Sequence, residues 1–191
     1  MDVGDAQPVD RPRCPWAGLD RDLVDYHDTE WGRPVHGQVA LFERLSLEAF
    51  QAGLSWLTVL RRREGFRRAF ADFDPAVLAG WGPAQVEQLL ADVGIIRNRA
   101  KVEAVLANAS RIVGDAIDLD GLLWSFAPPA GYRAHRPAHA GEVPVATEAS
   151  VAMTRQLRRL GLGFVGPRTC YALMQATGMV DDHVVGCWLA S

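Results

Sequence analysis

Two cysteines and two histidines near the ends of the chain form a candidate set of metal ligands. Cys14 and His27 lie near the start, and His183 and Cys187, four residues apart, lie near the end. The second spacing would put both side chains on one face of a helical turn. Two thiolates and two imidazoles suit tetrahedral zinc, and four protein ligands leave no position for an activated water. The pattern therefore predicts one structural zinc ion; the alternative is two buried cysteines and two ordinary histidines that share no metal.

Composition limits the classes of protein to which this chain can belong. Its 191 residues, 49% of them hydrophobic, suffice for one compact domain with a sizeable core. No apolar run reaches membrane-spanning length and residues 1–12 do not form a signal peptide, so we expect a cytoplasmic protein with no membrane segment. Three cysteines, two of them candidate ligands, fit a reducing compartment. The net charge of −3 is unusual for a nucleic-acid-binding protein, although arginines cluster at 61–68, 97–99 and 155–159.

Helical periodicity dominates the pattern of apolar residues. These residues recur at three- and four-residue spacing over 41–52, 86–93 and 102–112. Asp74-Pro75 and Gly82-Pro83 are typical helix starts, in which a capping residue precedes proline at the first helical position. Apolar alternation of period two is nowhere sustained. We therefore expect an all-α fold.

The chain divides into a short leader and one larger unit. Residues 1–12 are polar and contain two prolines, which predicts a disordered leader, and 13–191 is expected to be a single domain of two helical lobes. Two helices that meet at Gly94 would form a hairpin at about 86–110. The segment 127–146 is rich in proline, alanine and glycine and is expected to be a long loop. Two further helices are expected to follow it, over 147–160 and 167–177.

Several motifs in this order resemble one known family. They are RCPW (13–16), DYHDTEWG (25–32), LEAFQAGLSWLTVLRRRE (47–64), VGIIRNRAKVEAVLANA (93–109), WSF (124–126) and GFVGPRTCYALMQATGMVDDHVVGC (163–187). Together they are similar to the DNA-3-methyladenine glycosylase I family, zinc-containing enzymes of the helix-hairpin-helix DNA glycosylase superfamily. The resemblance covers nearly the whole chain. It implies base-excision repair of alkylated DNA: the enzyme would flip 3-methyladenine out of the duplex, hydrolyse its N-glycosidic bond and leave an abasic site.

The resemblance implies a pocket for the flipped base. Glu48 would accept from the exocyclic amine of the base and support the developing charge on the sugar as the catalytic carboxylate. Trp56 would stack on the base, with Tyr26 and Trp16 beside it. Adenine methylated at N3 is cationic in DNA, so aromatic faces and a carboxylate would favour it over neutral adenine. Phe50 departs from the polar residue that family members can carry, which would change the packing near Glu48.

A second set of residues is expected to contact double-stranded DNA. Its members lie in the QAGLSW motif and at the start of the hairpin's second helix: Gln51, Gly53, Leu54, Gly94, Arg97, Arg99 and Lys101. Leu54 would enter the gap left by the flipped nucleotide, and the hairpin would bind phosphate at a helix N-terminus. Lys101, the only lysine, would face phosphate and keep its proton. We therefore expect water to be the nucleophile, without a Schiff base.

Two alternatives to this activity remain open from the sequence. The first is a zinc-containing DNA-binding module without catalysis, which would lack Glu48 or Trp56. The second is a zinc hydrolase, which would need an open coordination position and a neighbouring general base. Glu48, Trp56 and the four metal-ligand residues are all present, which favours a monofunctional glycosylase. We expect this enzyme to be a monomer.

Overall fold

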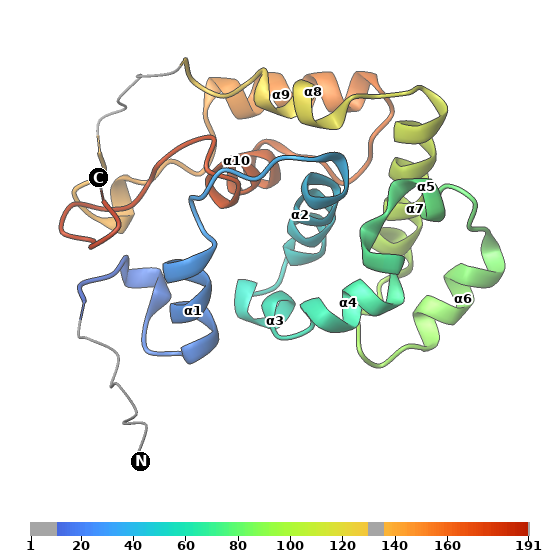
Figure 1. Ribbon diagram of the computed structural model, residues 1–191, viewed down its shortest axis with the longest axis horizontal. Helices are drawn as coiled ribbons and strands as arrows, with labels where there is room; N and C mark the ends of the chain where they lie inside the picture. Colours follow the sequence, from blue (N-terminus) through green and yellow to red (C-terminus); the bar gives the residue numbers. More distant parts are fainter. Residues whose placement is uncertain (1–10, 130–135, 191) are drawn as a thin grey trace, which may run out of the picture.

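The structure, a computed structural model, describes residues 11–129 and 136–190, and in these ranges it contains helices and no β-strand (Figure 1). The α-helices are α1 (Arg21–Thr29), α2 (Gln38–Gln51), α3 (Trp56–Leu60), α4 (Arg63–Ala69), α5 (Pro75–Leu78), α6 (Pro83–Ala91), α7 (Arg99–Gly114), α8 (Leu119–Trp124), α9 (Glu148–Arg159) and α10 (Pro167–Ala176). Three short 3-10 helices lie at Pro15–Ala17, Ala71–Phe73 and Ala140–Glu142. The prediction of an all-α fold is confirmed. None of the described helices is long and apolar enough to span a bilayer.

Helix starts follow the capping pattern of the sequence. The Asp74 side chain accepts from the backbone N–H of Ala76 at 2.9 Å, and Pro75 occupies the first position of α5. Gly82 precedes Pro83 in the same way at the start of α6. A side-chain cap such as that of Asp74 stabilises a helix by about 1 kcal/mol. Both predicted helix starts are confirmed.

Helix α2 lies at the centre of the fold and contacts α3, α7, α8 and α10 (Figure 1). Its residues from Leu45 to Phe50 are all buried. The Phe50 ring lies 4.5 Å from that of Phe66 and 5.9 Å from that of Phe70, measured between ring centroids. Burying one such side chain stabilises the fold by about 1.5–3 kcal/mol. Phe50 is therefore a core residue, and any group attached to α2 has a fixed position.

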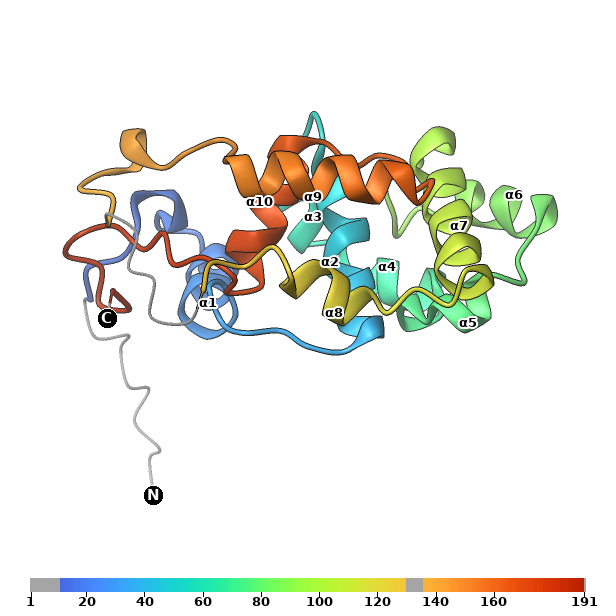
Figure 2. The same cartoon turned by 90° about the horizontal axis from the view of Figure 1, so that it is seen from above.

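Helices α6 and α7 are joined by a longer segment than the sequence suggested. Helix α6 ends at Ala91 and α7 begins at Arg99, so residues 92–98 separate them. Gly94 lies within this segment. Its carbonyl oxygen lies so close to Gly65 of α4 that a Cβ atom on Gly65 would collide with it. The connection is thus a loop packed against α4, not a turn at Gly94 alone. In Figure 1 and Figure 2, α6 lies at the opposite end of the molecule from the C-terminal segment.

The two ends of the described chain lie together. The backbone N–H of Trp188 donates to the carbonyl of Pro12 at 2.8 Å, and the Arg11 guanidinium lies over the Trp188 ring. Arg11 and Pro12, which form these contacts, belong to the predicted leader. Residues 1–10 of that leader lie outside the described ranges. The loop expected over 127–146 contains the short helix Ala140–Glu142, while 130–135 are likewise outside them.

One local prediction near the C-terminus is wrong. His183 and Cys187 do not share a helical turn, because the described chain has no helix after α10. Instead, the N–H of Cys187 donates to the carbonyl of Val184 at 3.0 Å and closes a tight turn. A spacing of four residues fits such a turn as well as a helix.

Candidate functional site

The structure brings three of the predicted base-binding residues together from three helices. Tyr26 comes from α1, Glu48 from α2, and Trp56 is the first residue of α3. The rings of Tyr26 and Trp56 have centroids 5.1 Å apart. Burial, followed by the nearby charge of Glu48, raises the pKa of the Tyr26 phenol. Trp16, 37% exposed, lies 6.2 Å from Tyr26 between ring centroids and extends the aromatic cluster towards solvent.

The turn between α2 and α3 sets the position of Trp56. Gly53 has a φ of +84°, a conformation that glycine adopts without strain. The N–H of Leu54 donates to the carbonyl of Gln51 at 2.7 Å and closes the turn. Ser55 then caps α3 by accepting from the N–H of Thr58. The predicted DNA-contacting residues Gln51, Gly53 and Leu54 thus lie beside the aromatic cluster, and the Leu54 side chain is 43% exposed.

Glu48 is a buried carboxyl group without a hydrogen-bond donor. The residue is 6% exposed, and no residue in the described ranges donates to it. Burial raises its pKa to about 8, although the positive charge of Arg44 opposes this shift. The indole N–H of Trp56 is also buried and lacks an acceptor among the described residues. An unpartnered buried polar group costs about 1–3 kcal/mol, so the two together indicate a site built for a ligand.

An ion-pair network that the sequence analysis missed lies behind Glu48. Glu30 accepts from Arg44 Nη2 at 2.8 Å and from Arg63 at 2.6 and 2.8 Å. Arg44 Nη1 is buried with no partner among the described residues. Arg44 precedes Glu48 by four residues on α2, which places both on the same face of the helix. That spacing was the available signal for Arg44, whereas the contact with Glu30 depends on how α1 packs.

Three of the four predicted metal ligands converge at the joined ends of the chain, and His183, the fourth, lies beside them. Ligand atoms of Cys14, His27 and Cys187 all lie within 4.8 Å of one another, and all three residues are buried. His27 Nε2 is 3.4 Å from the Cys187 sulfur. The ring of His183 lies 5.3 Å from that of His27 between centroids, and its Nε2 is buried without a partner in the described part of the chain.

Two aspartates hold these imidazole rings from the other side. His27 Nδ1 lies 2.8 Å from Asp28 Oδ1, and His183 Nδ1 lies 2.8 Å from Asp181 Oδ1. When Nδ1 carries the proton and donates it to a carboxylate, the lone pair of Nε2 is left for another partner. Asp28 also accepts from Arg13 at 2.7 Å, and this hydrogen bond lowers the pKa of Asp28. The sequence analysis did not single out either aspartate.

The residues predicted to bind phosphate differ in their surroundings. Arg97 is exposed and has no ion-pair partner in the described ranges, whereas Arg99 pairs with Glu87 at 2.8 Å. The prediction for Lys101 is wrong, because this residue is 8% exposed and its ammonium donates to the carbonyls of Phe50 and Ala52. Lys101 therefore faces the protein interior.

Part of the arginine cluster at 61–68 is also engaged within the protein. Arg61 pairs with Asp20 and Asp22, and Arg67 pairs with Glu43. Their charge is therefore partly neutralised before any nucleic acid binds.

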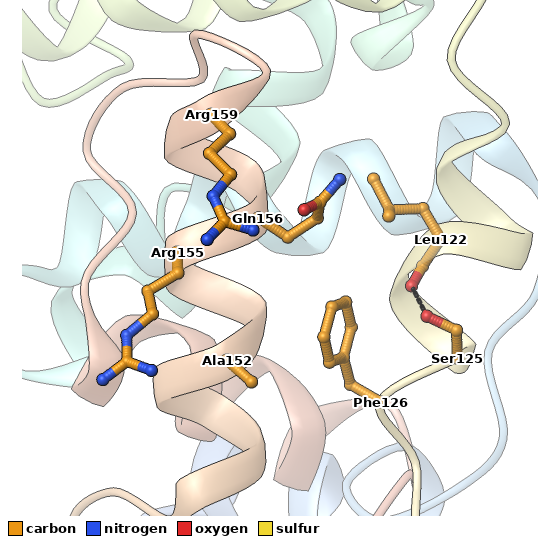
Figure 3. Close-up of a pocket in the computed structure, with 7 residues that line it drawn as sticks. All are labelled: Leu122, Ser125, Phe126, Ala152, Arg155, Gln156 and Arg159. Atoms are coloured by element: carbon orange, nitrogen blue, oxygen red, sulfur yellow. Dashed lines mark hydrogen bonds between the residues drawn. The ribbon is translucent and has the colours of Figure 1, made fainter.

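Of two cavities near the surface, the larger lies away from the aromatic cluster and the smaller touches it only at Tyr26. The larger, about 400 Å³, lies between α8 and α9 and contains none of the predicted site residues (Figure 3). It is lined by Leu122, Ser125, Phe126, Ala152, Arg155, Gln156 and Arg159. The smaller, about 320 Å³, lies beside Tyr26 and Glu30 and is lined mainly by charged side chains. The arrangement around Glu48, not cavity size, identifies the candidate site.

Comparisons with known proteins agree on one family. The profile of the methyladenine glycosylase family matches residues 16–190. A DNA-3-methyladenine glycosylase of Haemophilus influenzae is 40% identical over 183 residues, which cover 92% of this chain and 96% of that protein. A crystal structure of 3-methyladenine DNA glycosylase I has a TM-score of 0.88 at 39% identity and covers 93% of this chain and 99% of its own. A variant of such an enzyme in complex with 3-methyladenine has a TM-score of 0.84 at 29% identity, covering 92% and 95%.

The raised pKa of Glu48 predicts how stability depends on pH. Because the folded protein holds this proton up to about pH 8 and the unfolded chain releases it near pH 4.5, wild-type stability should fall across that window. Glu48→Gln removes the titration, so we expect it to be more stable than wild type at pH 7, by roughly 1 kcal/mol or more. Urea denaturation of both proteins at several pH values measures the difference. Parallel stability curves would contradict the prediction.

Proposed function

The chain belongs to the methyladenine glycosylase family, and we propose that Tyr26, Glu48 and Trp56 bind the base that it removes. The protein is a DNA glycosylase of base-excision repair: it flips 3-methyladenine out of the duplex, hydrolyses the N-glycosidic bond and leaves an abasic site. The observation that carries the assignment of the pocket is the Glu48 carboxyl. It is buried, has no donor in the described ranges, and lies near Tyr26, whose ring packs against that of Trp56.

The pocket would select the damaged base by its charge. Adenine methylated at N3 is a cation in DNA, and the faces of Tyr26 and Trp56 attract cations as well as stacking on flat rings. Glu48 holds a proton in the free enzyme at neutral pH, because burial raises its pKa to about 8. A bound cation favours the carboxylate, which then accepts from the exocyclic amine. Neutral adenine gains neither the ionic contact nor the full attraction to the rings.

The chemistry needs limited assistance from the protein. The bond between C1′ and the base breaks with its electron pair going to the base, whose positive charge is thereby neutralised. Water then adds to C1′ and loses a proton. A carboxylate at position 48 would stabilise the positive charge that develops on the sugar.

We assign DNA binding to the face that carries the α2–α3 turn and the α6–α7 pair. Exposed Leu54 is suited to fill the gap left by the flipped nucleotide, with Gln51 and Gly53 beside it. The loop 92–98, with Gly94 and Arg97, would act as the helix-hairpin-helix element that binds phosphate at the start of α7. Arg99 would contribute only after exchanging its pairing with Glu87.

We also propose that Cys14, His27, His183 and Cys187 hold one structural zinc ion. Zinc bonds of about 2.0–2.3 Å in tetrahedral geometry bring ligand atoms roughly 3.5 Å apart. The 3.4 Å between His27 Nε2 and the Cys187 sulfur fits this geometry, and the unpartnered Nε2 of His183 supports a fourth ligand. The ion would fasten the two chain ends. We further expect a monomer in the cytoplasm, where the three free cysteines stay reduced.

Substitutions in the pocket should impair excision without unfolding the protein. Trp56→Ala removes a stacking partner and should lower the excision rate about ten- to hundredfold. Glu48→Gln keeps the shape but removes the charge, so it should also lose activity. Release of free 3-methyladenine from methylated duplex DNA, resolved by chromatography, measures the effect. Gln156→Ala, in the cavity between α8 and α9, is the matched control and should excise normally. Wild-type rates in both pocket variants would disprove the assignment.

The zinc proposal predicts one ion per chain and a role in stability. Cys187→Ser should lose the metal and lower the melting temperature, because the chain ends are no longer fastened together. Cys170→Ala, which changes the third cysteine, should keep full metal content. Elemental analysis and thermal unfolding test both. The structural role is wrong if purified protein contains no zinc, or if removing zinc stops excision in protein that remains fully folded.

The surroundings of Lys101 predict a monofunctional enzyme. Lys101 is the only lysine, and its ammonium is bonded to two carbonyls inside the protein. It therefore has no access to the sugar, and borohydride added during turnover should trap no protein–DNA adduct. A bifunctional glycosylase serves as the positive control. An adduct that disappears in Lys101→Ala would contradict the prediction.

A further inference from the structure

Lys101 has an environment that its sequence position did not suggest. It belongs to the first turn of α7, and the Asn98 side chain caps the helix by accepting from its N–H at 3.1 Å. Its ammonium lies across the interface with α2, where it donates to Phe50 O at 2.9 Å and to Ala52 O at 2.6 Å. No acid in the described ranges forms an ion pair with it, and burial lowers its pKa.

The two carbonyls lie at the point where α2 ends. The last carbonyls of a helix have no partner within the helix and need other donors. Those of Ala49 and Gln51 accept from the backbone N–H groups of Ala52 and Leu54. Two further carbonyls, those of Phe50 and of the C-cap residue Ala52, accept from Lys101. One side chain from α7 thus binds the end of α2 through the carbonyls on both sides of Gln51.

The charge of Lys101 is also unfavourable for its position in α7 and favourable for its contact with α2. A cation is favoured at the C-terminus of a helix and disfavoured in the first turn, where the helix dipole is positive. Lys101 lies at the unfavourable end of its own helix and at the favourable end of α2. The local helix therefore does not account for a lysine here, whereas the contact with α2 does.

We propose that Lys101 is a positioning residue that couples the DNA-binding loop before α7 to the α2–α3 turn and the base pocket. This inference rests on the proposed function of that pocket. When phosphate fixes the start of α7, Lys101 fixes the end of α2 relative to it. Leu54 is then held at the gap in the duplex, and Glu48, on the last turns of α2, is held at the flipped base. Without the ammonium, the pocket remains but its alignment with bound DNA is lost.

The experiment separates binding of the base from excision out of DNA. Lys101→Met keeps the length of the side chain and removes its donors. We expect free 3-methyladenine to bind as tightly as to wild type, measured by tryptophan fluorescence. The single-turnover rate of excision from duplex DNA should fall roughly ten- to hundredfold, as expected for a displacement of about 1 Å. Both are measured well below the melting temperature.

Two further variants exclude a general loss of stability. Val105→Ala removes core packing from the same helix and should lower the melting temperature without slowing excision at low temperature. Lys101→Arg keeps the charge and the donors and should restore most of the excision rate. If Lys101→Met does not fold, Lys101→Gln, which retains one donor, should show an intermediate rate with normal binding of the free base.

The outcomes distinguish this inference from the proposed function. Wild-type excision rates in the Met and Gln variants, with wild-type protein releasing the base normally, would overturn the coupling role alone. A fall in free-base binding that matches the fall in excision would also overturn it, since the pocket itself would then be damaged. If wild-type protein releases no 3-methyladenine, the proposed function fails instead.

Discussion

A carboxyl group held on a buried helix, with no described donor to stabilise its charge, is the constraint around which this site is built. Water is largely excluded from Glu48, so the group keeps a proton at neutral pH until a cation arrives. Such a group destabilises the fold in its charged form and can persist only where the surroundings are rigid. The phenylalanine core on α2 supports that rigidity, because the buried Phe50 ring packs against those of Phe66 and Phe70.

A second buried polar group without a partner lies at the joined chain ends. His183 Nε2 is buried without a partner in the described ranges, while the other nitrogen of its ring lies against Asp181. In both places, a buried polar group lacks a hydrogen-bond partner in the described ranges: the Glu48 carboxyl, and Nε2 of a His183 ring whose Nδ1 is held by Asp181. The Glu48 carboxyl faces the position proposed for a base, and His183 Nε2 the position proposed for a metal. Trp16 lies between them, with its ring centroid 5.3 Å from that of His27 and 6.2 Å from that of Tyr26.

The sequence predicted those features that depend on near neighbours. Periodicity and capping residues predicted the helices, and the motifs predicted candidate metal ligands and pocket residues, several of which lie together in the structure. What it could not predict are contacts set by packing between distant segments. From its sequence position, Lys101 is expected to be a surface cation at the start of a helix. Its partners are instead the carbonyls of Phe50 and Ala52, which lie 51 and 49 residues earlier in the chain. The pairing of Glu30 with Arg44 and Arg63 likewise could not be predicted, because it depends on how the end of α1 lies relative to α2 and α4.

The ion pairs and hydrogen bonds within this acidic protein limit which of its cations can bind DNA. Arg61, Arg63 and Arg67 pair with carboxylates, and Lys101 binds backbone carbonyls. These groups build the pocket and its supports and therefore contribute little to phosphate neutralisation. The proposed binding surface therefore relies on backbone N–H groups at the start of α7 and on exposed cations such as Arg97. Contacts of this kind position the duplex without reading its sequence, which suits an enzyme that recognises damage by the charge of one flipped base.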